Sequence, residues 1–275
     1  MTNAVVFTHV KKVDQTGFLE ADDQLAAEAP LQIRLAYYSN NVRQTQDIAV
    51  TMRTPGRDAV LASGFLFTEG IISSPAEIQS VDLVETPEGS VATVQLHPGI
   101  QPQLKRIDRS FSSTAACGVC GKTSMGDIHT VINTPLSSSF QFPASVLFHL
   151  PEILNREQDL FKTTGGIHAA ALFNDQGELL MMEEDIGRHN AVDKVIGRAL
   201  EENAVALGSS LLLLSGRAGF ELIQKAAMAG IPVVAAIGAP SSLAVTVAEK
   251  WHITLVGFLK SQRFNIYSAP ERIRV

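Results

Sequence analysis

The sequence predicts an α/β protein, α+β overall, in which a β-rich N-terminal part precedes a region of alternating strands and helices. In the first hundred residues, apolar side chains recur with a period of two, which is typical of half-buried strands. After residue 143, short apolar runs alternate with helical segments. Residues 98–143 are rich in Ser, Thr, Gly and Pro and have few apolar runs. We therefore predict two domains, residues 1–140 and 141–275.

The N-terminal domain is expected to be a sheet with one helix. Leu31, Ile33, Leu35 and Tyr37 alternate with small or polar residues and indicate a strand. Further strands are predicted at 46–53, 78–85 and 90–97, the last two around the turn sequence TPEG, and a helix at 57–70 that ends at Gly70.

The C-terminal domain is expected to follow the order α-β-β-α-β-α-β-α-β. The predicted helices are 143–160, 189–203, 220–230 and 242–250, and the predicted strands are 167–173, 178–184, 211–215, 232–238 and 253–258. This order predicts a mostly parallel sheet, covered on both faces and opened by one antiparallel hairpin at NDQG. Ligands of such sheets bind beyond the carboxyl ends of the strands. Those ends lead into SGRAGFE, GAPSS and FLKSQRF.

Composition excludes several classes of protein. The net charge of −6 provides no broad basic surface for nucleic acid. The N-terminus has no apolar signal segment, and runs such as LLLL (211–214) are far below the roughly 20 residues that span a membrane. Two cysteines make a poor framework for a secreted protein. We expect a cytoplasmic protein that binds neither nucleic acid nor membrane.

The two cysteines, Cys117 and Cys120, lie in the stretch ACGVCGK. Zinc would need further ligands from histidine or carboxylate, and His129 is the only histidine within a dozen residues. A structural disulfide would close a very short loop in a reducing compartment. A thioredoxin-like redox pair would follow a buried strand, but SFSSTAA does not resemble one. An incidental role is also open, although free cysteines usually lie among apolar neighbours.

Sulfur transfer fits this stretch better than the other roles. A sulfur carrier needs an exposed thiolate that reaches two different active sites, and a glycine-containing loop allows this. Lys122 would favour the thiolate electrostatically. The second cysteine could release or protect a persulfide by exchange.

Two further motifs contain histidine. His168 lies at a point where zinc deaminases carry H-x-E, but Ala169 and Ala170 follow it, so the proton-shuttling glutamate of that motif is missing. His168 is either a site residue or a structural histidine. In EEDIGRHNAVDK, Asp185, His189 and Asp193 would share a helix face. This motif is open to three interpretations: a ligand or dimer contact near Gly187, helix capping by Asp185 with an Arg188–Asp193 ion pair, or a metal site.

The strand-end loops suit an anionic ligand. Arg217 and Ser241 each precede a helix whose N-terminal N–H groups are available to phosphate. Neither loop matches a P-loop or a GxGxxG fingerprint. The tail adds Lys260, Arg263, Arg272 and Arg274 against Glu271, a net charge of +3. Phe258, Phe264 and Tyr267 are candidates for stacking on a base.

Taken together, ACGVCGK, TGGIHAAAL, EEDIGRHNAVDKVIG, LSGRAGFELIQKA and GIPVVAAIGAPSSLAV resemble the formate dehydrogenase accessory sulfurtransferases, the FdhD sulfur-carrier family. The resemblance runs from about Asp47 to the C-terminus. It implies a cytoplasmic homodimer with a cytidine-deaminase-like C-terminal mixed sheet covered by helices. It also implies sulfur transfer from a cysteine desulfurase to the bis-guanine-dinucleotide molybdenum cofactor (tungsten in some relatives), for use by formate dehydrogenase.

The resemblance also assigns residues. Cys117 would carry the persulfide and Cys120 would assist it, with no structural metal. The cofactor, or GDP as a partial mimic, would contact Phe258, Leu259, Lys260, Ser261, Gln262 and Arg263, with Arg217 and Ser241 nearby. Lys260 departs from the family pattern, where arginine is expected, so the charge is kept but the bidentate fork is lost.

Three other functions stay open at this point. The chain could be a chaperone that only binds the cofactor or the apo-dehydrogenase. It could be a zinc-dependent nucleoside deaminase relative. It could also be a thiol redox switch.

Overall fold

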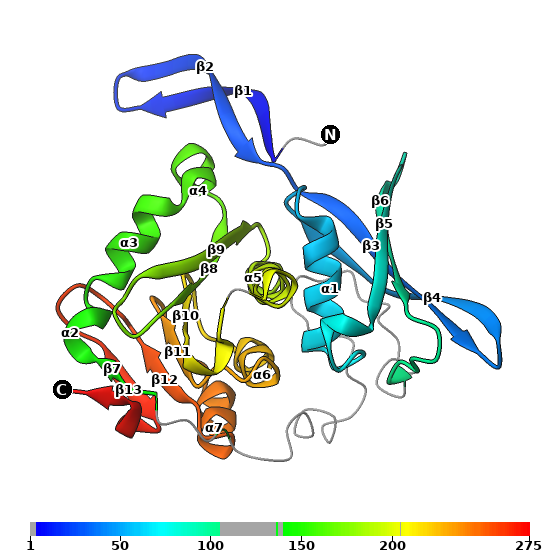
Figure 1. Cartoon of the computed structure of the whole chain (residues 1–275). Coiled ribbons are helices and arrows are strands. Elements are labelled where there is room, and N and C mark those ends of the chain that lie inside the picture. Colours follow the sequence, from blue (N-terminus) through cyan, green and yellow to red (C-terminus); the bar gives the residue numbers. More distant parts are fainter. Residues whose placement is uncertain (1–3, 105–135, 137–139, 204) are drawn as a thin grey trace.

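A four-stranded sheet forms most of the first half of the chain (Figure 1). We analysed a computed structural model that describes residues 4–104, 136, 140–203 and 205–275. The strands lie in the order β4-β3-β6-β5, and only β3 and β6 pair in parallel. Their bounds are β3 (Ala29–Ser39), β4 (Val42–Arg53), β5 (Ile78–Thr86) and β6 (Gly89–Leu96).

One face of this sheet is covered by α1 (Asp58–Thr68). Leu31, Ile33 and Leu35 project from β3 into this core and are fully buried. Leu61 and Leu66 of α1 meet them there. The period-two pattern therefore identified the buried face correctly, and the predicted strands and helix of this region are confirmed. A short 3-10 helix, η1 (Pro75–Glu77), joins α1 to β5.

A separate hairpin, β1 (Val5–Asp14) and β2 (Gly17–Ala26), precedes this sheet. It projects from the body of the molecule and reaches over α4 (Asp159–Thr164) (Figure 1). Neither strand is among the predicted elements, because charged residues interrupt any apolar alternation in this stretch. Several of its large apolar side chains are exposed, among them Phe7 at 71% and Val13 at 77%.

The second half of the chain contains a six-stranded sheet in the order β13-β12-β11-β10-β8-β9. Only β10, β11 and β12 run parallel to one another, and the other three pairings are antiparallel. The sheet is thus mixed, and the expectation of a mostly parallel sheet is wrong. The bounds are β8 (His168–Phe173), β9 (Leu179–Asp185), β10 (Leu211–Leu214), β11 (Val233–Ala236), β12 (Thr254–Gly257) and β13 (Asn265–Ser268).

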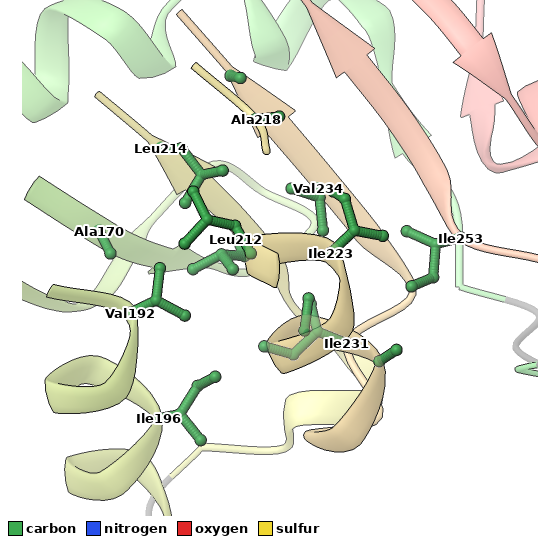
Figure 2. Packing of buried hydrophobic residues seen from close by; sticks show 14 of the residues in the cluster. Ala170, Val192, Ile196, Leu212, Leu214, Ala218, Ile223, Ile231, Val234 and Ile253 are labelled. Atoms are coloured by element: carbon green, nitrogen blue, oxygen red, sulfur yellow. The ribbon is translucent and has the colours of Figure 1, made fainter. Parts of the chain in front are cut away.

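Helices cover both faces of this mixed sheet. On one face lie α5 (Arg188–Glu202), α6 (Phe220–Met228) and α7 (Ser242–Lys250). Figure 2 shows Leu212 and Leu214 of β10 pointing toward this face, where Val192 and Ile223 approach from α5 and α6.

The opposite face is covered by α2 (Ala144–Leu147) and α3 (Leu150–Glu157), beside the short strands β7 (Phe142–Pro143) and β14 (Ile273–Arg274). Leu211 and Leu213 of β10 project toward this face. Alternate residues of one short strand therefore enter two different cores, which explains its unbroken apolar run. The remaining 3-10 helices are η5 (Leu207–Ser209) and η6 (Pro270–Arg272).

The predicted helix at 143–160 consists of three short helices, α2, α3 and α4. Pro151 lies in the first turn of α3, where its missing N–H needs no partner within the helix. Inside a longer helix the same residue would remove a hydrogen bond and clash with the preceding turn, so one continuous helix does not form. Gln158, with ψ at 80°, separates α3 from α4. The other predicted elements of the second half are confirmed within a few residues. The domain boundary near residue 140 stays a prediction.

None of the described helices combines the length and the apolar composition needed to cross a membrane.

Candidate functional site

Three loops meet at the carboxyl ends of the parallel strands. They follow β10, β11 and β12, and main-chain hydrogen bonds join them. Gly238 N donates to Gly216 O at 2.9 Å, Ala218 N donates to Ala239 O at 3.1 Å, and Phe258 N donates to Gly238 O at 3.0 Å. The strand-end loops predicted from the sequence thus form one connected surface. For this surface we keep the name strand-end site, defined as residues 215–219, 237–241 and 258–263.

Glycine is required where these loops pass each other. A Cβ on Gly238 would lie 2.9 Å from Gly216 O, and one on Gly257 would lie 2.7 Å from Pro240 Cδ. Since the first of these contacts is to backbone, no side-chain rotation could relieve it. The close packing holds the three loops in one arrangement.

Arg217 and Ser241 occupy the first two of these loops. Ser241 is the N-cap of α7 and accepts a hydrogen bond from Ala244 N at 3.2 Å, as the capping pattern predicts. Gly219 is the N-cap of α6 and supplies no side-chain cap. The first N–H groups of α6 are therefore not satisfied by their own cap residue, which suits an anion beside Arg217. Contact with a ligand stays a prediction for both residues.

The third loop has an exposed edge and a buried anchor. Phe258 has a left-handed backbone (φ 52°) and a side chain that is 43% exposed. Leu259, by contrast, is only 1% exposed and belongs to the core between the sheet and α3. A turn in which Lys260 N donates to Arg263 O at 2.9 Å presents four exposed residues, Lys260, Ser261, Gln262 and Arg263. The side chain of Leu259 therefore anchors the loop rather than facing a ligand.

Two of the three aromatic side chains predicted to stack on a base pack against other parts of the protein instead. Phe264 packs against Phe148, with ring centroids 5.4 Å apart, and Tyr267 packs against the core beneath α7. Phe258 alone among the three candidates has an exposed ring.

The basic tail does not form one cationic surface. Arg272 is 2% exposed, and its Nη2 donates to the carbonyl oxygen of Leu136 at 3.1 Å. Burial lowers the pKa of Arg272, although Glu271 opposes this effect. Arg272 thus has a structural role, and Lys260 and Arg263 remain the tail cations in the strand-end site.

The face proposed for Asp185, His189 and Asp193 does not exist. Asp185 is the last residue of strand β9 and does not belong to α5. Its Oδ2 forms an ion pair with Lys194 Nζ at 2.7 Å. Asp193 pairs with Lys225 at 2.9 Å, not with Arg188. The metal interpretation is therefore wrong for this trio. Across the described ranges no group of three or more His, Cys, Asp or Glu residues is arranged to hold a metal.

The space beside Gly187 is filled from within the chain. Asp185 Oδ1 accepts hydrogen bonds from Gly187 N at 2.8 Å and from Asn190 Nδ2 at 3.0 Å. A Cβ on Gly187 would lie 3.0 Å from that same Asn190 nitrogen. The prediction that Asp185 caps the helix is wrong, because Gly187 is the N-cap of α5 and no side chain caps it; Asp185 instead forms a turn just before the helix. The close approach of Asn190 accounts for glycine at position 187, and a ligand or dimer contact there stays a prediction.

His168 begins β8 at the same edge of the sheet as the strand-end site. Its Nδ1 lies 3.3 Å from the position that a Cβ on Gly216 would occupy. Burial lowers the pKa of His168, and the charges of Arg188 and His189 add to this effect, whereas Asp185 opposes it. His168, Arg188 and His189 therefore lie within electrostatic reach of one another.

The lowered pKa of His168 predicts a pH-dependent stability. Because the folded pKa is below the ordinary value of 6.5, the unfolded chain takes up its proton first as the pH falls. The contribution is present above pH 6.5 and is lost as the pH falls through the folded pKa. The free energy of unfolding, measured in urea at about pH 7.5 and 5.5, should decrease between the two pH values. This decrease should be smaller for His168→Gln than for the wild type. His97→Gln, at an exposed position, is the control. Equal losses in all three proteins would contradict the prediction.

A close histidine–carboxylate contact that the sequence did not reveal joins α5 and α6 at this edge. His189 Nε2 lies 2.7 Å from Glu221 Oε2, and the two side chains are 13% and 10% exposed. Each is the second residue of its helix. The sequence indicated that His189 and Glu221 each lie near the start of a helix. It could not indicate that they pair, because no periodicity of a helix or strand relates residues 32 positions apart.

The cysteine pair predicted to carry sulfur, Cys117 and Cys120, lies outside the described residues.

Comparison with known proteins identifies the family. A family model described as the FdhD/NarQ family matches residues 26–274. The chain belongs to the FdhD/NarQ family. The resemblance noted from the sequence motifs is thereby confirmed, as are the α/β class and the mixed sheet.

Curated relatives of this FdhD/NarQ member share most of its length. The protein named sulfur carrier protein FdhD from Streptomyces coelicolor is 44% identical over 91% of this chain and 89% of its own. The one from Mycobacterium bovis is 42% identical over 99% and 100%. A crystal structure named for a formate dehydrogenase accessory protein from Desulfotalea psychrophila superposes with a TM-score of 0.72 at 26% identity, and covers 98% of this chain and 100% of that one.

Proposed function

We propose that this FdhD/NarQ member is a cytoplasmic sulfur carrier that serves formate dehydrogenase. It would accept sulfur from the persulfide of a cysteine desulfurase and transfer it to the bis-guanine-dinucleotide molybdenum cofactor. The observation that carries this proposal is the near full-length relationship to proteins named sulfur carriers. In this proposal the cofactor is the substrate of the transfer, not a resident group.

Loading is a thiol–persulfide exchange. The thiolate of Cys117 attacks the terminal sulfur of the donor persulfide, a new S–S bond forms, and the donor cysteine leaves as a thiolate with the electron pair of the broken bond. Protons and electrons balance without any further reactant. Cys120 would protect or release the bound sulfur by the same exchange.

The strand-end site supports the second half of the proposal, binding of a guanine dinucleotide. Its third loop, residues 258–263, exposes Lys260, Arg263 and the ring of Phe258. Its inner loop places Arg217 next to the N-terminus of α6, whose cap residue is a glycine. Cations, N–H groups and one exposed ring are the features that a nucleoside diphosphate needs.

Persulfide formation tests the carrier role. Incubation with a cysteine desulfurase and cysteine should add about 32 Da, one sulfur atom, to the wild type. Cys117→Ala should lose the added mass and fail to activate formate dehydrogenase. Cys120→Ala is the matched variant and should still become loaded. If the double variant restores dehydrogenase activity, the chain acts as a chaperone rather than as a carrier.

GDP titration tests the binding site independently of the cysteines. Arg217→Ala and Lys260→Ala should each weaken GDP binding about tenfold, the effect of one lost charge-assisted contact. Arg43→Ala in β4 is the control. It removes an exposed arginine that is distant in sequence from the strand-end site, so the affinity for GDP should be unchanged. Wild-type protein without measurable affinity for GDP would contradict the proposed site.

We further propose that the protein acts as a homodimer. The exposed apolar side chains of the β1–β2 hairpin support this, because an isolated two-stranded hairpin is only marginally stable in water. The chain has a mass of 29.6 kDa, and light scattering at micromolar concentration should give about twice that value. A monomer mass across that range would contradict the proposal.

A further inference from the structure

One edge of the N-terminal sheet is open in the part of the chain that the structure describes. In the strand order β4-β3-β6-β5, β5 pairs with β6 on one side, and no described strand pairs with its other side. Such an edge carries backbone N–H and C=O groups that the sheet itself does not use. β5 also exposes two large apolar side chains, Leu83 at 51% and Val84 at 56%. Because successive residues of a strand point to opposite faces, an added strand would cover apolar surface on both faces.

The opposite edge strand, β4, is engaged by α5. Asn190 Nδ2 donates a hydrogen bond to Met52 O at 2.8 Å, and Asn190 Oδ1 accepts one from Thr51 Oγ1 at 3.0 Å. β5 also lacks the lysine and proline by which many edge strands block the addition of another strand. Its charged residues, Asp82 and Glu85, are both acidic. The two edges of the sheet therefore differ, and β5 is the one that can accept a further strand.

A groove lies beside the first half of β5. It has a volume of about 550 Å³ and lies between β5, α1 and the last turns of α5. Figure 1 shows α1 between α5 and the sheet that ends in β5. We call it the edge groove, defined by Ala59, Ser63, Ile78, Val81, Gly197 and Leu200.

The edge groove suits an apolar side chain. Small residues on both helices, Ala59, Ser63 and Gly197, leave the space open. Ile78 and Val81 are only partly buried in the core beneath α1, so they still offer apolar surface to the groove. The volume is within the range of about 300–1,000 Å³ that is usual for binding pockets.

The surroundings of the edge groove are acidic. Residues 70–104 include four acidic residues but neither lysine nor arginine. Three of the four, Asp82, Glu85 and Glu88, are exposed. Glu201, near the end of α5, lines the groove and is exposed as well. Charge complementarity therefore favours a cationic partner at this edge.

We propose that the edge of β5 and the edge groove bind an extended, basic segment of a partner protein. The segment adds a strand to β5 through main-chain hydrogen bonds and inserts an apolar side chain into the edge groove. Its lysine or arginine side chains lie beside Asp82 and Glu201. In this mode of recognition the backbone supplies affinity and alternate side chains supply specificity. The inference goes beyond sulfur transfer and does not rest on it.

A second copy of this chain fits the same edge poorly. In a symmetric dimer two β5 strands would lie side by side, and the acidic side chains of one would face those of the other. Like charges opposite each other on paired strands are destabilising. Dimerisation through the β1–β2 hairpin would not require this edge.

The edge groove and the strand-end site lie at opposite ends of α5. His189, at the start of the helix, contacts Glu221 close to the strand-end site, whereas Glu201 lines the edge groove. At about 1.5 Å per residue, the helix rises about 18 Å between positions 189 and 201. A partner held at the edge groove would therefore leave the strand-end site free for its own ligand.

The test measures the binding of short peptides to the full-length protein. The probe is a fluorescein-labelled peptide of about six residues, the usual length of a strand, with alternating valine and lysine. A peptide with glutamate in place of lysine tests the charge, and one with serine in place of valine tests the apolar contact. A version with N-methylated backbone amides tests the main-chain pairing. Fluorescence anisotropy gives the affinity, and hydrogen–deuterium exchange of residues 78–86 reports on strand addition.

The valine–lysine peptide should bind and should slow amide exchange in residues 78–86. Each of the three altered peptides should bind at least about tenfold more weakly. Asp82→Lys combined with Glu201→Lys should weaken binding of the valine–lysine peptide about tenfold, because two attractive contacts become repulsive. Both positions are exposed, so the fold should be retained.

Two further variants complete the test. Ser63→Met fills the edge groove and should weaken binding by a similar factor of about ten. Glu157→Lys combined with Glu249→Lys makes the same change of net charge at exposed positions on α3 and α7, and should leave the affinity unchanged.

Absence of binding to the wild type would overturn the inference, as would binding that leaves exchange in residues 78–86 unchanged. Equal affinity for the lysine and glutamate peptides, or equal weakening in both double variants, would also overturn it, because either result indicates general attraction or none. Without peptide, exchange in residues 78–86 that slows as the protein concentration rises would show that a second copy occupies the edge, and would overturn it too. Persulfide loading is measured separately, so none of these results bears on the proposed function.

Discussion

Replacement of Lys225 by methionine is expected to lower the free energy of unfolding by about 3–5 kcal/mol, the usual cost of leaving a buried charge without its partner. Lys225 is 4% exposed and lies in α6. Its Nζ is 2.9 Å from Asp193 of α5 and 2.9 Å from Glu69, just after α1. Methionine fills a similar volume, so the expected loss comes from charge rather than from packing.

The reason for this large effect is the burial of Asp193, which is 1% exposed. Its Oδ1 accepts hydrogen bonds from Lys225 Nζ at 2.9 Å and from Thr68 Oγ1 at 2.6 Å. Thr68 also receives a hydrogen bond from Lys225 at 3.0 Å. Without the lysine, a carboxylate far from water would keep Thr68 as its one side-chain donor among the described residues.

Burial alone would lower the pKa of Lys225, but the carboxylates of Asp193 and Glu69 outweigh it and raise that pKa above its ordinary value of 10.5. A raised folded pKa means that the stabilisation is complete below pH 10.5 and is lost only as the pH rises through the folded pKa. The loss in Lys225→Met should therefore be the same at about pH 7 and pH 9.

Urea unfolding followed by circular dichroism gives the measurement. Lys12→Met is the matched control, since Lys12 and Asp23 form an exposed pair at 3.5 Å that should contribute at most about 1 kcal/mol. Adding Asp193→Leu to Lys225→Met should recover most of the loss, because the fully buried carboxylate is then removed and Glu69, the other partner of Lys225, is 18% exposed. A loss below about 1 kcal/mol in Lys225→Met would show that water reaches Asp193 and that the pair is not needed.

The strands of both sheets, except β13, were predictable because apolar residues mark each buried face. LLLL at 211–214 coincides with β10, and both cores accept its side chains. The hairpin of β1 and β2 gave no such signal. Its apolar residues are exposed at positions such as Phe18 and Leu19, so no buried face imposes a pattern on the sequence.

The strand-end site was predictable at the level of loops but not of side chains. Strand order alone places the loops after β10, β11 and β12 at one edge. The burial of Leu259 and Arg272 and the pairing of His189 with Glu221 depend on how separate elements pack. Sequence periodicity describes one element at a time and contains no information on such partners.

The crossing of α1 and α5 likewise depends on residues far apart in the sequence, and it supports a second stability prediction. Substitution of either Gly64 or Gly197 by alanine should lower the free energy of unfolding by about 3 kcal/mol, the upper part of the usual range for overpacking. A Cβ on Gly64 would lie 2.0 Å from Asp193 O, and one on Gly197 would lie 2.3 Å from Val60 O. Both obstacles are backbone atoms, so the two helices would have to move apart.

Alanine has a better intrinsic helix propensity than glycine by about 1 kcal/mol, which works against the predicted loss. The clash should prevail because separation of α1 from α5 would also strain the contacts of Asp193 with Thr68 and Lys225. Gly166→Ala is the control, since its nearest neighbour would be Thr164 O at an ordinary 3.8 Å. Urea midpoints should fall for Gly64→Ala and Gly197→Ala and stay near the wild type for Gly166→Ala. A gain in stability at Gly64 or Gly197 would mean that helix propensity outweighs the contact and that the helices do not approach so closely.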